Sequence, residues 1–288
     1  MIDKITIFSY NLFRFITLKL PRKWAYLPGK LIAYLAYLLT PKRKKLAQEN
    51  IKKALDISDR EAKKITKDVY MNLGLNFAEF LMEDQFTEAD IEKMVEFNNL
   101  EYLDQALEEN KGVIIYSAHL GNWELLGALL AIKGYKINSI AKEQKNSLFD
   151  QKINKIRRGI GIGIIPKGLA VRQAFKALKK NEIVALLADQ DARSRGWKLN
   201  FFDRPASVFI GPVQFAQRTG APIVPMFFHR QGWLKHELIC YPPIKIAADS
   251  SEAELKEELK KLLELTEKEI EKSPEDWMWL HRRWKKYN

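Results

Sequence analysis

The central part of the chain alternates short apolar runs with segments of helical period. Six apolar runs have the length expected of buried strands: Val113–Ser117, Lys136–Ala141, Ile162–Pro166, Ile183–Ala188, Ile223–Phe228 and Leu238–Ile246. Between them lie four segments with the apolar spacing of helices: Trp123–Ile132, Leu148–Arg158, Ala170–Lys179 and Gly211–Arg218. Strands that alternate with helices predict an α/β fold whose central sheet is largely parallel and flanked by helices.

Helices are also expected on both sides of this central part. Ser58 and Glu61 form a capping box, in which each side chain binds a free backbone N–H at the helix start. Apolar residues then keep a helical period to about Met82, and a further helix is expected near Leu100 to Glu109. Near the end of the chain, Ser251–Lys272 predicts a long charged helix with one inward face of leucines.

The first 45 residues combine apolar runs with ten lysines and arginines, against Asp3 as the single acidic residue. A membrane-spanning helix needs about 20 mostly apolar residues. The longest clean run, Leu31–Leu39, is too short, and Pro28, Gly29 and Lys30 interrupt the longer window around it. We therefore expect residues 1–45 to be a membrane-associating segment that lies at the interface. An amphipathic helix pair covering the core, or a true span, are the alternatives.

Composition narrows the class of protein. With 288 residues and 47% hydrophobic content, the chain can bury a full core as one domain with appendages. Its single cysteine, Cys240, excludes an internal disulfide framework and a multi-cysteine metal site. The net charge of +12 indicates an anionic partner, for which a nucleic acid, a membrane and an acidic protein are the candidates.

The candidate chemistry lies where the first of the six strands ends. His119 stands in the turn after that strand, Gly121 permits a tight turn, and a helix starts around Asn122. Open α/β sheets bind ligands at this edge, and the first helical turn is expected to bring Glu124 back towards the imidazole. Such a pair suits general-base catalysis, in which the imidazole takes a proton from a hydroxyl that attacks a carbonyl. The carboxylate would fix the tautomer, and backbone N–H groups near Gly121 are candidates to hold the oxyanion. A structural role for His119 is the alternative.

Two further regions have the composition of binding sites. Asp189 and Asp191 follow the strand Ile183–Ala188, where they could hold cations or form an ion network with the neighbouring arginines. The tail Trp277–Lys286 interleaves aromatic and basic residues, which suits nucleic-acid stacking, membrane anchoring or packing onto the domain. No histidine spacing typical of a metal site occurs, so we predict no metal.

Four blocks of sequence stand in order along the chain. The first is Ala118–Glu124, and the second contains Arg157 and Gly161. The third comprises Asp189–Asp191, Phe201–Ala206, Gly211-Pro212 and Thr219–Pro225, and the last is Pro274–Trp284. In this order they resemble the bacterial lipid A biosynthesis acyltransferase family, the late acyltransferases that add secondary chains to lipid A. That family is a branch of the lysophospholipid acyltransferase class, and the resemblance spans nearly the entire chain.

The resemblance implies an enzyme that moves a fatty acyl chain from a thioester to a hydroxyl of an anionic glycolipid, with a lipid A precursor as the first candidate acceptor. The donor would be acyl carrier protein or acyl-CoA, and no cofactor is implied. The resemblance makes His119 the general base and Glu124 its partner. Arg157 and Asp189 become substrate-site candidates, to which we add the residues Gly121, Asn122 and Asp191. Residues 46–288 would form the acyltransferase domain, at the cytoplasmic face of the bacterial inner membrane, as a peripheral or monotopic protein.

Two departures from the family leave the acceptor open. Leu120 stands where many lipid A enzymes have an aromatic residue, and the usual N-terminal transmembrane helix is interrupted here. Relatives that acylate mannosylated phosphatidylinositol share the same motifs, so that lipid is the alternative acceptor. A thioesterase that uses water, and a membrane-binding protein without catalysis, are the further alternatives. We expect no nucleic-acid partner, because such binding explains the charge but not the His119–Glu124 junction.

Overall fold

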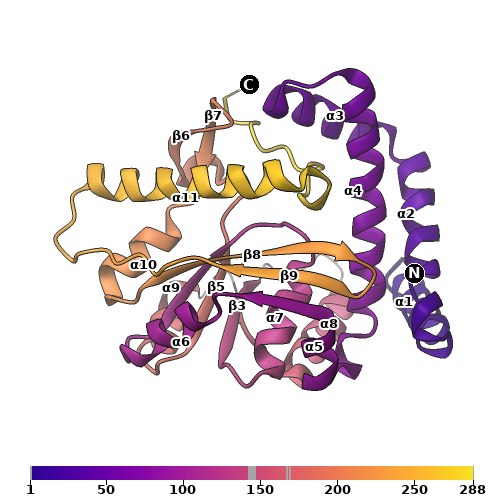
Figure 1. The fold of residues 1–288 in the computed structure, drawn as a ribbon, viewed down its shortest axis with the longest axis horizontal. Coiled ribbons are helices and arrows are strands. Elements are labelled where there is room, and N and C mark those ends of the chain that lie inside the picture. Colours follow the sequence, from indigo (N-terminus) through magenta and orange to yellow (C-terminus); the bar gives the residue numbers. More distant parts are fainter. Residues whose placement is uncertain (1, 142–146, 167, 169, 288) are drawn as a thin grey trace.

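The computed structural model describes residues 2–141, 147–166, 168 and 170–287 (Figure 1). Its main sheet has the strand order β1-β9-β8-β2-β5-β3-β4. Strands β8 and β9 pair antiparallel, and the other five neighbouring pairs are parallel. The strands are β1 (Val95–Asn98), β2 (Val113–Ser117), β3 (Ile137–Ala141), β4 (Gly163–Pro166), β5 (Ile183–Leu187), β8 (Ile223–Gly232) and β9 (Lys235–Cys240). The predicted α/β class with a largely parallel sheet is confirmed.

Helices cover both faces of this sheet, as Figure 1 shows for the layers above and below β8 and β9. Ile114 and Tyr116 of β2 pack towards α9, α10 and α11, whereas Val113 and Ile115 pack towards α5, α6 and α7. Burial on both faces explains why the strands are continuous apolar runs in the sequence. The helices are α5 (Glu88–Met94), α6 (Glu101–Glu108), α7 (Trp123–Ile132), α8 (Ser147–Ile160), α9 (Ala170–Leu178), α10 (Gly211–Thr219) and α11 (Glu252–Lys272).

The sheet differs from the sequence prediction at three places. The last strand begins at Lys235 and ends at Cys240, because Pro242 and Pro243 follow and have no N–H for the ladder. Strand β1 was not predicted, since it is a short edge strand with only one fully buried residue. The hairpin of β6 (Trp197–Phe201) and β7 (Arg204–Val208) was not predicted either.

Four further helices lie before α5 in the chain: α1 (Ile2–Lys19), α2 (Leu27–Leu39), α3 (Pro41–Leu55) and α4 (Asp59–Phe80). The predicted capping box at Ser58 is present and starts α4. Helices α2 and α4 cross where Gly29 meets Gly74, and a Cβ on Gly29 would lie 2.1 Å from the Gly74 carbonyl oxygen. This close approach holds α2 against the rest of the molecule, on the far side of α4 from the sheet (Figure 1).

Helices α1 and α2 carry most of the exposed apolar surface. Of the 15 large hydrophobic side chains that are exposed among the described residues, 12 lie between Phe8 and Leu39. Within the described part of the chain, no helix combines the length and apolar character that a membrane span requires. The division at residue 45 falls inside α3 and stays a prediction.

Candidate active site

The central pair of the site comes from two neighbouring parallel strands. Ser117 ends β2 and lies opposite Leu187, which ends β5. His119 and Asp189 each stand two residues beyond these strand ends, so sheet register brings them together. The His119 Nδ1 lies 2.7 Å from Asp189 Oδ1, and the backbone N–H of His119 donates to Asp189 Oδ2 at 3.1 Å. The carboxylate therefore places the proton on Nδ1 and leaves Nε2 free to act as a base.

Asp189 is buried, with 2% of its surface exposed, and its second oxygen also accepts a hydrogen bond from Trp277 Nε1 at 2.7 Å. Burial alone would raise the pKa of Asp189, but the charge of His119 and these hydrogen bonds lower it to about 2. For His119, burial alone would lower the pKa, because it disfavours the charged imidazolium. The charge and hydrogen bond of Asp189 outweigh burial, and the charge of Glu124 adds to them, so the His119 pKa is raised. The site thus stabilises the protonated, imidazolium form of His119.

Glu124 is not the hydrogen-bonding partner of His119 that the sequence analysis predicted. Its carboxylate binds Arg157 of α8, whose Nη2 lies 2.7 and 2.8 Å from the two oxygens and whose Nε lies 3.1 Å from Oε2. Among the described residues, no hydrogen bond joins Glu124 to His119. The reason is that α7 begins at Trp123, so Glu124 is already on the helix and faces α8 across the pocket. Its influence on the imidazole is electrostatic.

Asn122 was predicted to bind substrate, but it has a structural role. It is buried, and its Oδ1 caps α7 by accepting the Leu125 N–H at 3.1 Å. Its Nδ2 donates to Glu79 Oε2 at 2.7 Å. Glu79 lies fully buried on α4 and also binds Arg230 and His236 from β8 and β9. Asn122 is therefore the point at which a buried charge network holds the start of α7.

Gly121 was also predicted to bind substrate, and N–H groups near it were candidates to hold the oxyanion. The Gly121 N–H itself donates to the Asp276 carbonyl at 3.0 Å, and its own carbonyl accepts from Asn76 at 2.6 Å, so this N–H is occupied. Its φ is +57°, and a Cβ would lie 1.8 Å from the Phe228 carbonyl oxygen. Glycine is required here so that the turn carrying His119 can lie against β8.

A pocket of about 520 Å³ extends from His119 between the sheet and α7. At the edge of the sheet its lining is polar, with Glu124, Arg157, Gln190 and Asp191 beside the histidine. Further in, the lining is apolar and comes from β2, β3, β5, α7 and the start of β4: Ile115, Leu126, Gly127, Leu130, Ile137, Ile162 and Ala185. The pocket thus joins a proton acceptor and a cation to a space suited to a hydrocarbon chain.

Two neighbours of His119 were not predicted as site residues. The Gln190 Nε2 lies 3.3 Å from His119 Nε2, so a substrate hydroxyl must take the place of this amide. The Trp123 ring packs edge-on against the imidazole, with ring centroids 5.1 Å apart. Gln190 could have been predicted as a site residue, because it stands between two carboxylates at the end of a strand. Nothing in the local sequence marks Trp123 as a site residue.

Asp191, which was predicted to bind substrate, lines the pocket, and its remaining contacts are local. Its backbone N–H donates to His281 Nε2 at 3.2 Å, and its Oδ1 accepts the Arg193 N–H at 3.0 Å. The expected alternatives for Asp189, a cation site or an ion network with arginines, do not hold, since its ion pair is with His119. Within the described residues no group of acidic, histidine and cysteine side chains is arranged to hold a metal.

The aromatic tail packs onto the domain. Trp277, Trp279 and Trp284 are buried, with 2%, 0% and 1% of their surfaces exposed. Trp277 also holds Asp189, and the Met278 N–H donates to the His119 carbonyl at 3.0 Å. The tail therefore supports the catalytic turn, and its tryptophans are not a nucleic-acid or membrane surface.

Three proteins whose names describe acyltransferases are similar in sequence to this chain. Phosphatidylinositol mannoside acyltransferase of Mycobacterium tuberculosis is 27% identical over 191 residues, covering 64% of this chain and 58% of that protein. The lipid A biosynthesis lauroyltransferase of Escherichia coli is 25% identical over 276 residues, covering 94% of this chain and 88% of the enzyme. The palmitoleoyltransferase of the same organism is 23% identical over 272 residues, covering 91% and 87%. The matched region thus spans less than two thirds of the mycobacterial protein.

The family model described as bacterial lipid A biosynthesis acyltransferase matches residues 1–286, nearly the full chain. The match covers both the helical N-terminal section and the sheet with its His119 edge. The protein belongs to the bacterial lipid A biosynthesis acyltransferase family.

Proposed function

We propose that the protein moves a fatty acyl chain from an acyl thioester to a hydroxyl of a membrane glycolipid by direct attack. The observation that carries the proposal is the His119–Asp189 pair at the mouth of an apolar pocket. The Nε2 of His119 takes the proton of the acceptor hydroxyl as its oxygen attacks the thioester carbonyl. The tetrahedral intermediate then expels the thiolate, and the imidazolium returns its proton to the sulfur.

The pocket supports a fatty acyl donor. Its apolar inner part would hold the acyl chain, which places the thioester carbonyl beside His119 at the polar edge. The Glu124–Arg157 ion pair lines the same edge, where Arg157 is suited to contact the polar part of either substrate. Acyl carrier protein is our first candidate donor, since it is acidic and the chain carries a net charge of +12. Acyl-CoA is the second.

A lipid A precursor is the acceptor that we favour. The family model and the two Escherichia coli relatives cover nearly the entire chain. The mycobacterial relative, whose name gives phosphatidylinositol mannoside as its acceptor, has the higher identity over a shorter region. Mannosylated phosphatidylinositol is therefore the second candidate.

The N-terminal helices support a membrane surface as the place of reaction. Exposed apolar side chains of α1 and α2 lie beside basic ones, which is the combination that binds anionic lipid headgroups. We propose that the protein lies at the cytoplasmic face of the inner membrane as a peripheral or monotopic protein.

The test measures transfer of a labelled acyl chain from acyl carrier protein to a lipid A precursor in vesicles, with wild-type protein and His119→Ala. We expect the rate of acyl transfer to be about 10²- to 10⁴-fold lower in the variant, because it lacks the base. The thermal midpoint of both proteins controls for folding. Release of the chain at a rate indifferent to glycolipid would make the protein a thioesterase. Absence of transfer with both donors and both glycolipids would refute the proposal.

A further inference from the structure

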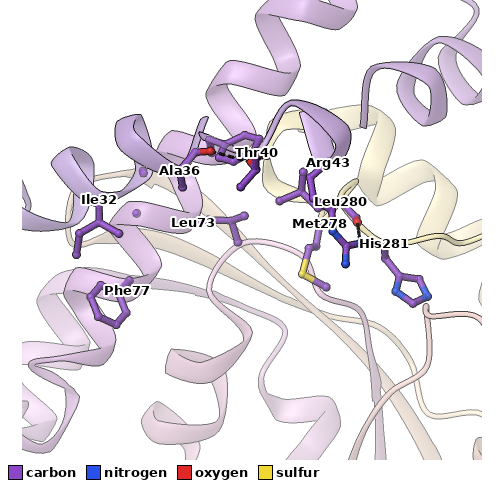
Figure 2. Close-up of a pocket in the computed structure, with 12 residues that line it drawn as sticks. Ile32, Ala36, Thr40, Arg43, Leu73, Phe77, Met278, Leu280 and His281 are labelled. Carbon is purple, nitrogen blue, oxygen red and sulfur yellow. Dashed lines mark hydrogen bonds between the residues drawn. The ribbon is translucent and has the colours of Figure 1, made fainter. Parts of the chain in front are cut away.

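A second cavity lies between α2 and α4, away from the acyl pocket (Figure 2). Its volume is about 480 Å³. Its walls are mostly apolar side chains of α2, α4 and the C-terminal tail: Ile32, Ala36, Leu73, Phe77, Met278 and Leu280. We call this cavity the α2–α4 groove. Figure 2 shows Ile32 and Phe77 at one end of it, and Arg43 and His281 at the other.

The Arg43–His281 end of the groove is cationic and rich in hydrogen-bond donors. Arg43 Nη1 donates to the Leu280 carbonyl at 3.1 Å, and in the described part of the chain its guanidinium has no carboxylate in an ion pair with it. The His281 Nε2 accepts the Asp191 N–H, so the ring proton is on Nδ1, which is available as a donor. This end can bind an anion that carries oxygen acceptors.

Two hydrogen bonds connect lining residues of the groove with lining residues of the catalytic pocket. Asp191 lines the catalytic pocket and binds His281, which lines the groove. Met278, another lining residue, donates its N–H to the carbonyl of His119. A headgroup that contacts His281 would therefore be one hydrogen-bonded residue away from the catalytic pocket.

The groove is continuous with the exposed apolar surface of α2. Ile32 and Ala36 line it, and their chain neighbours Leu31 and Leu35 are exposed. Leu39, close to Arg43 in the chain, has 76% of its surface exposed. Exposed leucines and groove-lining residues thus alternate along the same helix, which would let a hydrocarbon chain contact both.

We propose that the α2–α4 groove binds one hydrocarbon chain of a phosphate-bearing membrane lipid, with the phosphate at Arg43 and His281. Apolar walls match the chain, and the Arg43 guanidinium, which has no carboxylate partner among the described residues, matches the phosphate. Identification of this lipid as the acyl acceptor rests on the proposed function, whereas binding of the lipid does not. Donor and acceptor chains would then lie in separate cavities, whose linings are joined by the Asp191–His281 hydrogen bond.

The test uses phosphatidic acid with a photoreactive diazirine on one acyl chain, placed in phosphatidylcholine vesicles, and maps the adducts by mass spectrometry. We expect adducts on Ile32, Leu73 or Phe77. Ala36→Trp should reduce these adducts at least about tenfold. The indole would fill part of the groove and displace two or more methylenes of the lipid chain from it. Ala253→Trp, on the exposed side of α11, is the matched control and should leave them unchanged. Wild-type adducts confined to the exposed leucines of α2 would overturn the proposal, whether or not Ala36→Trp folds.

The phosphate contact has its own comparison. Arg43→Gln should lower groove adducts of the phosphatidic acid probe and leave those of a phosphatidylcholine probe unchanged, whereas Arg60→Gln on the exposed start of α4 should change neither. Equal losses with both probes would refute a phosphate site. His119→Ala should keep the adducts while losing acyl transfer. Adducts without transfer in wild-type protein would refute the proposed function alone.

Discussion

Replacing Asp189 by asparagine should harm catalysis more than replacing it by alanine. The Asp189 Oδ2 accepts two hydrogen bonds, from the His119 backbone N–H at 3.1 Å and from Trp277 Nε1 at 2.7 Å. An asparagine must place its carbonyl oxygen there, which turns its NH₂ towards His119 Nδ1. That NH₂ would donate to Nδ1 and move the ring proton to Nε2, so the base would be blocked.

The structure gives the size of this effect. Restoring the active tautomer in Asp189→Asn would require the amide to turn over and leave two buried donors without an acceptor, at about 1–3 kcal/mol each. That cost corresponds to a rate loss of about 30-fold to 10⁴-fold at 25 °C. In Asp189→Ala neither tautomer is enforced, so the variant should keep more activity even though it loses more stability.

Rates of acyl transfer and thermal midpoints of the two variants provide the measurement, and ¹⁵N chemical shifts of His119 report its tautomer. The pH profile adds a second readout. Wild-type activity should fall as pH drops through the raised pKa of His119, because the base becomes protonated. Both variants lack the charge that raises this pKa, so their acid limb should move to lower pH. Higher activity in Asp189→Asn than in Asp189→Ala, with equal folding, would refute the tautomer argument.

Three further predictions follow from the pocket and the N-terminal helices. Glu124→Gln should lower kcat/KM about tenfold by freeing Arg157 and should shift the acid limb to lower pH, as a pH–rate series would show. Gly127→Leu fills the acyl pocket, where the nearest atom to a new Cβ is 3.6 Å away. Competition between thioesters should then favour shorter chains by about 10- to 100-fold, while Gly159→Leu on α8 should not change the preference. Leu39→Asp should weaken vesicle binding by about tenfold or more without changing the thermal midpoint; unchanged sedimentation with vesicles would contradict a membrane role for this residue.

Many strands and helices of the fold were predictable from the sequence, because their signals are local. The strands of the sheet interior are buried on both faces and so appear as apolar runs, and capping boxes mark the starts of α4 and α11. The β6–β7 hairpin lacked such a signal. Its turn residues Phe202 and Asp203 both have positive φ, at 50° and 52°, in positions where Asn-Gly is the usual sequence.

The site was predictable only in part, because its partnerships are not local. The position of His119 followed from a strand, a turn and a helix within one short segment. Its partner Asp189 lies 70 residues further on and is brought there by the register of β2 against β5. Glu124 is five residues from His119 in sequence, yet the start of α7 turns it to Arg157. Proximity along the chain therefore did not reveal the carboxylate that is hydrogen-bonded to the His119 Nδ1.

Buried polar contacts hold the turn that carries His119. Each of these contacts needs a particular donor or acceptor, so few other residues would fit at these positions. Asn76 and the Asp276 carbonyl bind the backbone of Gly121, while Glu79 holds the side chain of Asn122. Glu79 in turn binds Arg230, so α4, β8 and the catalytic turn share one network. Because α4 also packs against α2, the same helix contributes both to the positioning of His119 and to a wall of the α2–α4 groove. The fold thereby fixes the base relative to the surface from which a lipid would arrive.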